Sequence, residues 1–117
     1  MSVEILKEGN NSIVYVNHQG LSGSKLISNF AEANKILING GQDQLLLTDF
    51  RNASLSKEVI DYIKSDETKA ASGNCKKQAI VGITGIKKMI LNVYNGMTKA
   101  NMKIFNTFEE AKEYLLK

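Results

Sequence analysis

The residues best suited to chemistry follow three leucines in the segment LLLTDFRNASLS, residues 45–56. An acid, a base, an amide and two hydroxyls appear there in quick succession, and such groups can pair charges, accept a phosphate or bind a partner protein. The abrupt change from apolar to polar predicts the end of a buried strand, followed by the functional edge of an α/β domain. The candidate residues for a partner-binding or phosphorylation site are Asp49, Arg51, Asn52, Ser54 and Ser56.

Asp49 allows two interpretations. An acid at the end of a parallel strand is the phosphoacceptor of receiver domains, which also need an acidic pair near the first strand to bind Mg²⁺. The first strands predicted here offer only Glu4 and Glu8, around a turn. We therefore favour the second interpretation, in which Asp49 accepts hydrogen bonds from backbone amides at the strand end or pairs with Arg51.

Ser54 and Ser56 lie at the N-terminus of a predicted helix, so either serine could be its N-cap, which contributes about 1 kcal/mol. A phosphate on either serine would meet free amides and the positive end of the helix dipole. The sequence leaves capping and phosphorylation open.

A second candidate site is the turn between a predicted strand and the helix that follows it, GITG. Helix amides could hold an anion there, with Gly82, Thr84 and Gly85 as the candidate residues. The turn is neither G-x-G-x-x-G nor a P-loop, because no glycine–lysine–threonine follows. Tight backbone geometry is the favoured explanation for its glycines.

Other reactive residue types are isolated in the sequence. His18 is the only histidine and Cys75 the only cysteine, and each is predicted to lie in a loop. We expect His18 to be a surface residue, Cys75 to be no nucleophile, and no metal site to form. No Ser-His-Asp order and no matched carboxylate pair stands out, so we expect no catalytic residue, no cofactor and a non-enzymatic role.

The composition is that of an ordinary globular domain. The chain has 117 residues, of which 43% are hydrophobic and 23% charged, and this predicts one domain over residues 1–117. No stretch reaches the ~20 apolar residues of a membrane span, and no apolar signal region opens the chain, so a cytoplasmic protein is expected. A net charge of +3, carried by scattered lysines and one arginine, argues against nucleic-acid binding.

Hydrophobic patterning predicts the elements that must position these residues. Two short β-like runs, 3–7 and 12–17, flank the turn EGNN and form a hairpin or a pair of edge strands. Further strands are predicted at 44–50, 77–83 and 102–106. Helices are predicted at 24–38, 55–69 and 85–95, and after a Thr107–Glu110 capping box that opens a last helix burying Phe108, Ala111, Tyr114 and Leu115.

The order β-β-α-β-α-β-α-β-α predicts an α/β fold with a mixed, mostly parallel sheet of about five strands, an N-terminal hairpin and four helices. Its crossovers should be right-handed. In open α/β sheets, ligands bind outside the carboxyl ends of the strands, at a switch in strand order. We therefore expect the residues after Leu47 to line that edge, together with Gly82, Thr84, Gly85, Asn106 and Thr107.

Residues 44–117 resemble the STAS-like group of small bacterial proteins, which are similar in fold to the sporulation anti-sigma-factor antagonists and often labelled SpoIIAA-like. The resemblance rests on the strand ending in Asp49, the unit AIVGITGIKKMIL and the ending MKIFNTFEEAKEYL. It implies a regulatory or protein-binding module in which a serine at the following helix start is phosphorylated, within a run of aspartate, serine, serine and glycine. Here that glycine is missing and the serines are not adjacent, so Ser54 and Ser56 are candidates by position only.

Two functions follow as hypotheses. The first is a regulatory module that binds a protein partner through the edge around Asp49. The second is a carrier or sensor of a small or lipid-like molecule, with an apolar pocket enclosed by the helices at 24–38 and 85–97, where Met89 and Met97 lie. An exposed hairpin edge could also pair two chains into a homodimer.

Overall fold

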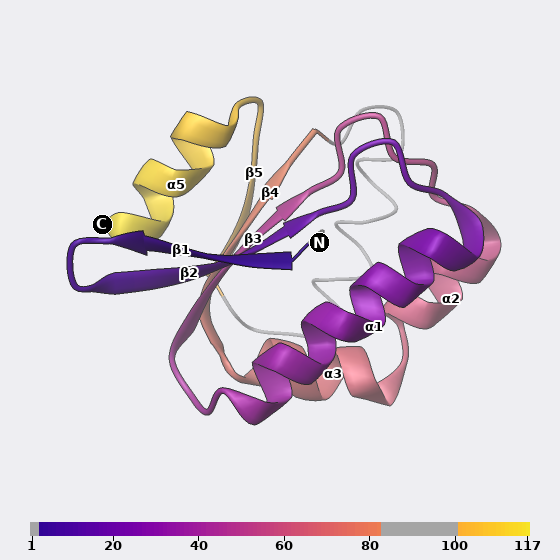
Figure 1. The fold of residues 1–117 in the computed structure, drawn as a ribbon, viewed down its shortest axis with the longest axis horizontal. Helices are drawn as coiled ribbons and strands as arrows, with labels where there is room; N and C mark the ends of the chain where they lie inside the picture. Colours follow the sequence, from indigo (N-terminus) through magenta and orange to yellow (C-terminus); the bar gives the residue numbers. More distant parts are fainter. Residues whose placement is uncertain (1–2, 83–100) are drawn as a thin grey trace.

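A computed structural model describes residues 3–82 and 101–117. Its five strands form a single sheet, with α1, α2 and α3 on one face and α5 on the other (Figure 1). The elements in chain order are β1 (Val3–Glu8), β2 (Asn11–Asn17), α1 (Gly23–Asn39), β3 (Gln44–Asp49), α2 (Lys57–Ile63), α3 (Asp66–Gly73), β4 (Cys75–Val81), β5 (Asn101–Phe105) and α5 (Phe108–Leu116). Only β1 and β2 pair antiparallel, so the mixed, mostly parallel α/β sheet is confirmed, as are four helices within these ranges.

The strands follow one another across the sheet in sequence order, β1-β2-β3-β4-β5. The crossovers from β2 to β3 and from β3 to β4 therefore move in the same direction, and crossovers of one hand then place α1, α2 and α3 on one face. Between β1 and β5 the order of the described strands never reverses, so the predicted switch in strand order is wrong. The carboxyl ends of β2 to β5 nevertheless meet at one edge of the sheet, because these strands are parallel.

The N-terminal hairpin is confirmed. Its register runs from the pair Val3–Val16 to the pair Glu8–Asn11. Gly9 lies in the turn with a φ of 61°, a conformation that glycine adopts at little cost. The alternative of two edge strands is wrong, because β2 also pairs with β3. β1 is the edge, and its Ile5 is 47% exposed. Pairing of two chains at this edge stays a prediction.

The pleat of the sheet divides the core into two parts. On the face under α5, residues of β2, β3 and β4 pack with Ala111 and Leu115. On the other face, Leu26 and Phe30 of α1 pack with Val59 and Ile63 of α2. Since both faces of β3 are covered, its apolar run shows no alternation, as predicted for a buried parallel strand.

The predicted helix at 55–69 is wrong, because two short helices occupy this segment. α2 ends at Ile63, and the Ser65 side chain accepts a hydrogen bond from the Thr68 backbone N–H, which caps the start of α3. The predicted helix at 85–95 lies outside the described residues. No helix within 3–82 or 101–117 has the length and apolar character to cross a membrane.

The loop predicted around Cys75 is also wrong. Cys75 is the first residue of β4 and is 8% exposed, and its thiol lies 3.6 Å from the carbonyl oxygen of Ala71. Burial raises the pKa of this thiol to about 12, so it stays protonated at neutral pH.

Thr107 is the N-cap of α5, as predicted, but the Glu110 carboxylate bonds its hydroxyl and not its backbone amide. The Thr107 hydroxyl accepts from the backbone N–H of Glu110 at 3.1 Å, and donates to the Glu110 carboxylate at 3.0 Å. Ala111 and Leu115 are buried, whereas Phe108 and Tyr114 are half-buried. The helix is thereby fixed against β3, β4 and β5, at the face of the sheet where Asp49 lies.

Candidate functional site at the carboxyl edge

The last residues of β2 to β5 form a row across the sheet: Asn17, Asp49, Val81 and Phe105. The backbone ladder continues one residue further, since His18 N–H donates to the Asp49 carbonyl and Phe50 N–H donates to the Val81 carbonyl, both at 2.8 Å. Successive side chains of a strand point to opposite faces. The row that contains Asp49 therefore faces α5, and the residues that follow it face α1 and α2.

Asp49 and Arg51 form the ion pair that the sequence predicted. The Asp49 side chain is fully buried, and the Arg51 Nη2 donates to its Oδ2 at 2.6 Å while Nε lies 3.0 and 3.1 Å from the two carboxylate oxygens. The Arg51 backbone N–H and the Tyr15 hydroxyl donate to the same carboxylate, at 3.1 and 2.8 Å. Because both oxygens of Asp49 are engaged and buried, the carboxylate is unsuited to the role of a phosphoacceptor.

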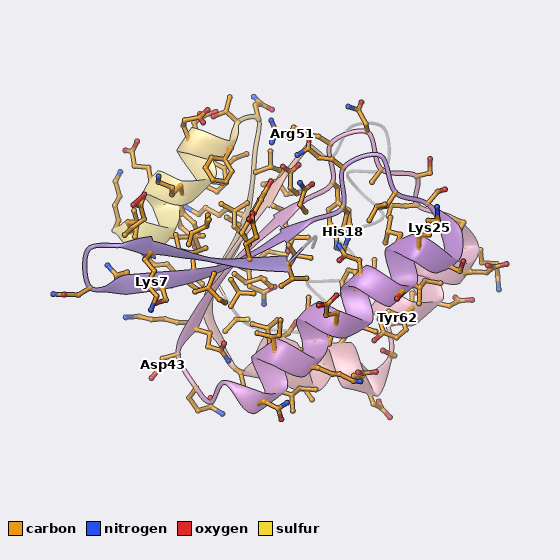
Figure 2. All side chains as sticks on the ribbon, in the orientation of Figure 1. Lys7, His18, Lys25, Asp43, Arg51 and Tyr62 are labelled. Atoms are coloured by element: carbon orange, nitrogen blue, oxygen red, sulfur yellow. The ribbon has the colours of Figure 1, made fainter. Side chains whose placement is uncertain are left out.

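The pair is held in its charged form. Burial alone would raise the pKa of Asp49, but the hydrogen bonds and charge of Arg51, with the bond from Tyr15, outweigh burial and lower it. Burial and the neighbouring carboxylate raise the pKa of Tyr15 to about 12, so this phenol remains a donor. Arg51 is 41% exposed in its side chain, and Figure 2 shows it at the carboxyl ends of the strands.

Gly82 lies directly against Arg51. It adopts a φ of +83°, and a Cβ added to it would come within 2.3 Å of Arg51 Cγ and 2.6 Å of the Arg51 backbone N. This close approach supports the interpretation that tight backbone geometry requires the glycine. Thr84 and Gly85, the other residues of the candidate anion-binding turn, lie outside the described residues.

The loop of residues 51–56 presents its side chains alternately inward and outward. Ala53 and Leu55 are half-buried against the core below α1 and α2, whereas Asn52, Ser54 and Ser56 are exposed. Asn52 has a φ of 58°, a left-handed conformation that asparagine tolerates better than most residues. Two backbone bonds fix the loop: Ala53 N–H donates to the Phe50 carbonyl and Ser54 N–H to the Leu21 carbonyl, both at 3.0 Å.

The two candidate serines differ in structural role. Ser56 is the N-cap of α2, and its hydroxyl accepts from the Val59 backbone N–H at 3.4 Å. Ser54 lies outside the helix, where its exposed side chain is free of this capping role. The structure thus assigns the cap, which the sequence left open between the two.

His18 is the buried residue of this edge that sequence reasoning placed wrongly. It was expected at the surface, but it is fully buried, and its ring stacks between Phe30 and Phe50 with centroid distances of 5.3 and 5.0 Å. Figure 2 shows it between the sheet and α1. The alternation of Val14, Val16 and residue 18 along β2 was the available signal, because it continues the apolar face of the strand.

The neighbours of His18 determine its protonation. The Asn29 side-chain amide donates to the Asn17 carbonyl at 3.1 Å and contacts His18 Nδ1 at 3.0 Å. Since the carbonyl fixes the orientation of the amide, Nδ1 must accept and Nε2 carries the proton. Burial lowers the pKa of His18 to about 4, against a small opposing effect of the Asp49 charge, so the ring is neutral at pH 7.

The structure thus brings Asp49, Arg51 and Gly82 into contact and exposes Asn52, Ser54 and Ser56 on the adjacent loop. Within the described ranges, no three His, Cys, Asp or Glu side chains are grouped so that they could hold a metal ion. A cavity of about 20 Å³ lies between α1, α3 and the sheet. A broader depression of about 700 Å³ lies at the opposite end of the strands, between the hairpin and the end of α5.

Comparison with known proteins supports the fold. No protein-family model matches the chain, and no curated protein matches it. A solved structure from Shewanella loihica, described as an uncharacterised protein of the DUF3478 family with a SpoIIAA-like fold, superposes with a TM-score of 0.68 at 16% sequence identity. The match covers 97% of this chain and 91% of that one. The expected resemblance is thereby confirmed at the level of architecture: the chain has a SpoIIAA-like fold.

Proposed function

We propose that this chain is a non-enzymatic regulatory module that binds a protein partner through the loop of residues 51–56. The observation that carries the proposal is the alternation in this loop, whose inward residues Ala53 and Leu55 anchor it to the core while Asn52, Ser54 and Ser56 face solvent. Polar groups on an anchored loop can form hydrogen bonds with a partner without a large loss of conformational entropy.

The ion pair beside the loop supports the same role. Arg51 is held by the buried Asp49 carboxylate, and Gly82 packs against its backbone, so the start of the loop has little freedom. Asp49 and His18, the groups that could take part in catalysis, are both fully buried and held by neighbouring side chains. This arrangement favours a binding role over a catalytic one.

Phosphorylation would regulate the same surface. Ser54 is exposed and outside α2, so a phosphate there would add negative charge while the Ser56 cap stays in place. At Ser56, a phosphate would replace the capping hydroxyl and face the first amides of α2. The resemblance to the anti-sigma-factor antagonists supports a switch at this position, and both serines are included in the proposal.

The test compares complexes recovered from the host after chemical cross-linking. In the variant Ser54→Asp/Ser56→Asp, the protein partner that cross-links to the wild-type loop should decrease at least tenfold in quantitative mass spectrometry. The matched control is Asn10→Asp/Ser12→Asp, which adds the same charge at the exposed hairpin turn, at the opposite end of β2. The proposal fails if the cross-linked partner is unchanged, or if both variants lose it equally.

The alternative of a lipid-like or small-molecule carrier gains no support from the cavity beneath α1. Pockets for such ligands typically measure about 300 Å³ or more, whereas this cavity measures about 20 Å³. The larger depression is lined by charged as well as apolar residues, and the charges of Lys76, Lys77 and Asp43 do not suit an apolar molecule. Met89 and Met97, the residues named for the carrier, lie outside the described residues, so that part stays a prediction.

A further inference from the structure

Among the described residues, no charged side chain lines the cavity beneath α1 and α3. The apolar residues that line it are Val16, Phe30, Ala33, Leu37, Leu46 and Ala71. The polar residues that line it are His18, Asn34, Thr48, Thr68, Ser72 and Gln78. None of these lining residues is an acid, a lysine or an arginine, and His18 is the neutral tautomer that carries its proton on Nε2.

Two buried donors that line the cavity have no hydrogen-bond partner in the described part of the chain. The Gln78 Nε2 and His18 Nε2 atoms are inaccessible to bulk solvent, and neither has a hydrogen-bond partner among the described residues. Gln78 is 1% exposed and His18 is fully buried. Nearly all buried polar groups in folded proteins are hydrogen-bonded, to the protein or to ordered water, so each of these N–H groups calls for an acceptor.

The position of Gln78 makes the unpaired amide unusual. In the sheet it pairs with Leu46, which is a buried apolar residue, and the neighbouring Ala79 and Ile80 are buried as well. An apolar side chain would be the ordinary choice in the middle of such a strand. A glutamine there is best accommodated if its amide reaches a polar group inside the cavity.

The charge and size of the cavity decide the nature of the acceptor. A metal cation is disfavoured because N–H donors line the site, and an anion is disfavoured because no lysine or arginine of residues 3–82 or 101–117 lines it. A neutral oxygen fits both conditions. A volume of about 20 Å³ accommodates one or two water molecules, which need about 10–15 Å³ each and bind where two or more polar groups converge.

We propose that this cavity is an internal hydration site, in which ordered water accepts hydrogen bonds from the side-chain N–H groups of Gln78 and His18. Thr48 and Ser72 also line the cavity, and their hydroxyls would supply further partners for the water. The water completes the hydrogen bonding of the layer between α1, α3 and the sheet. This site is separate from the loop of residues 51–56, and the proposal stands or fails independently of the partner-binding function.

A crystal structure at atomic resolution tests the site directly. The expected result is compact density for water, at 2.7–3.2 Å from Gln78 Nε2 or His18 Nε2. Magnetisation transfer from water to the Gln78 amide protons in an NMR spectrum should accompany it. An empty cavity without transfer overturns the proposal, and so does elongated density, which would show an organic ligand in place of water.

A pair of glutamine variants adds a solution test. If Gln78 is satisfied by water, Gln78→Leu will leave the Tm unchanged or lower it, whereas removal of an unsatisfied buried amide would raise the Tm by several degrees. Gln44→Leu is the matched control, because Gln44 Nε2 donates to the Leu37 and Gly41 carbonyls at 2.6 and 2.8 Å. This control should lower the Tm. A rise in Tm for Gln78→Leu contradicts the proposal.

Discussion

The backbone N–H of His18 donates to the Asp49 carbonyl at 2.8 Å, yet the side chains of these two residues lie on opposite faces of the sheet. Asp49 binds Tyr15 on the face of α5, and His18 stacks on Phe30 on the face of α1. Two buried titratable groups thus occupy separate parts of the core although they lie on adjacent strand ends. Their effects on stability can be measured one at a time.

The free energy of unfolding should depend on pH through the protonation of His18. Its pKa is about 4 in the folded protein and about 6.5 when unfolded, so the unfolded chain binds a proton that the folded chain does not. The resulting stability is complete above pH 6.5 and is lost as the pH falls toward 4. Between pH 7.5 and pH 5, the free energy of unfolding should decrease by about 2 kcal/mol from this group. Urea unfolding at the two pH values measures the decrease.

His18→Phe is the control for this prediction, since an aromatic ring still fills the space between Phe30 and Phe50. His18 is the only histidine, so the variant should lack most of the pH dependence between 5 and 7.5. An equal decrease in both proteins would assign the effect to other groups.

Removal of the Arg51 guanidinium should destabilise the protein, because the buried Asp49 carboxylate then lacks its charged partner. In Arg51→Met, Asp49 stays buried and keeps only the Tyr15 and backbone bonds, so the free energy of unfolding should fall by about 3 kcal/mol. A double-mutant cycle with Asp49→Asn, followed by urea unfolding, measures the coupling. The double variant should lose less than the sum of the single variants, and strict additivity would show that the pair contributes nothing.

Gly82→Ala should destabilise the protein strongly. The added Cβ would meet the Arg51 backbone, and the φ of +83° is strained for alanine, so a loss of about 3 kcal/mol is expected. Gly20→Ala is matched in backbone conformation, with a φ of +72°, but has nothing within 4 Å of the added Cβ. Its loss should be about 1 kcal/mol. Thermal unfolding compares the two, and equal losses would argue against the contact with Arg51.

Alanine variants of Ser54 and Ser56 should show which serine stabilises the protein as the N-cap of α2. Ser56→Ala removes the acceptor of the Val59 N–H and should lower the free energy of unfolding by about 1 kcal/mol. Ser54→Ala removes only an exposed hydroxyl and should change it by less than about 0.5 kcal/mol. Chemical denaturation of both variants tests the assignment, which a larger loss for Ser54→Ala would reverse.

The architecture and the Asp49–Arg51 pair could be predicted because their signals lie in neighbouring residues of the sequence. The turn at Gly9, the unalternating run of β3 and the Thr107 cap are read from neighbouring residues, and the structure contains all three. The pairing of Asp49 with Arg51 could also be predicted, since only Phe50 separates them in the chain. The division of residues 55–69 into two helices was missed because Ser54 and Ser56 were considered as N-caps and Ser65, which caps α3, was not.

The amino-acid sequence by itself determined the alternation of strands and helices, and with it the SpoIIAA-like fold and the polar residues at the end of β3. Only the tertiary structure decided which of those residues are buried. His18 is buried between Phe30 and Phe50, and Gly82 packs so closely on Arg51 that an added Cβ would clash. The physical reason is that local patterns fix backbone conformation, whereas burial, close approach and hydrogen-bond satisfaction depend on side chains brought together from distant parts of the chain.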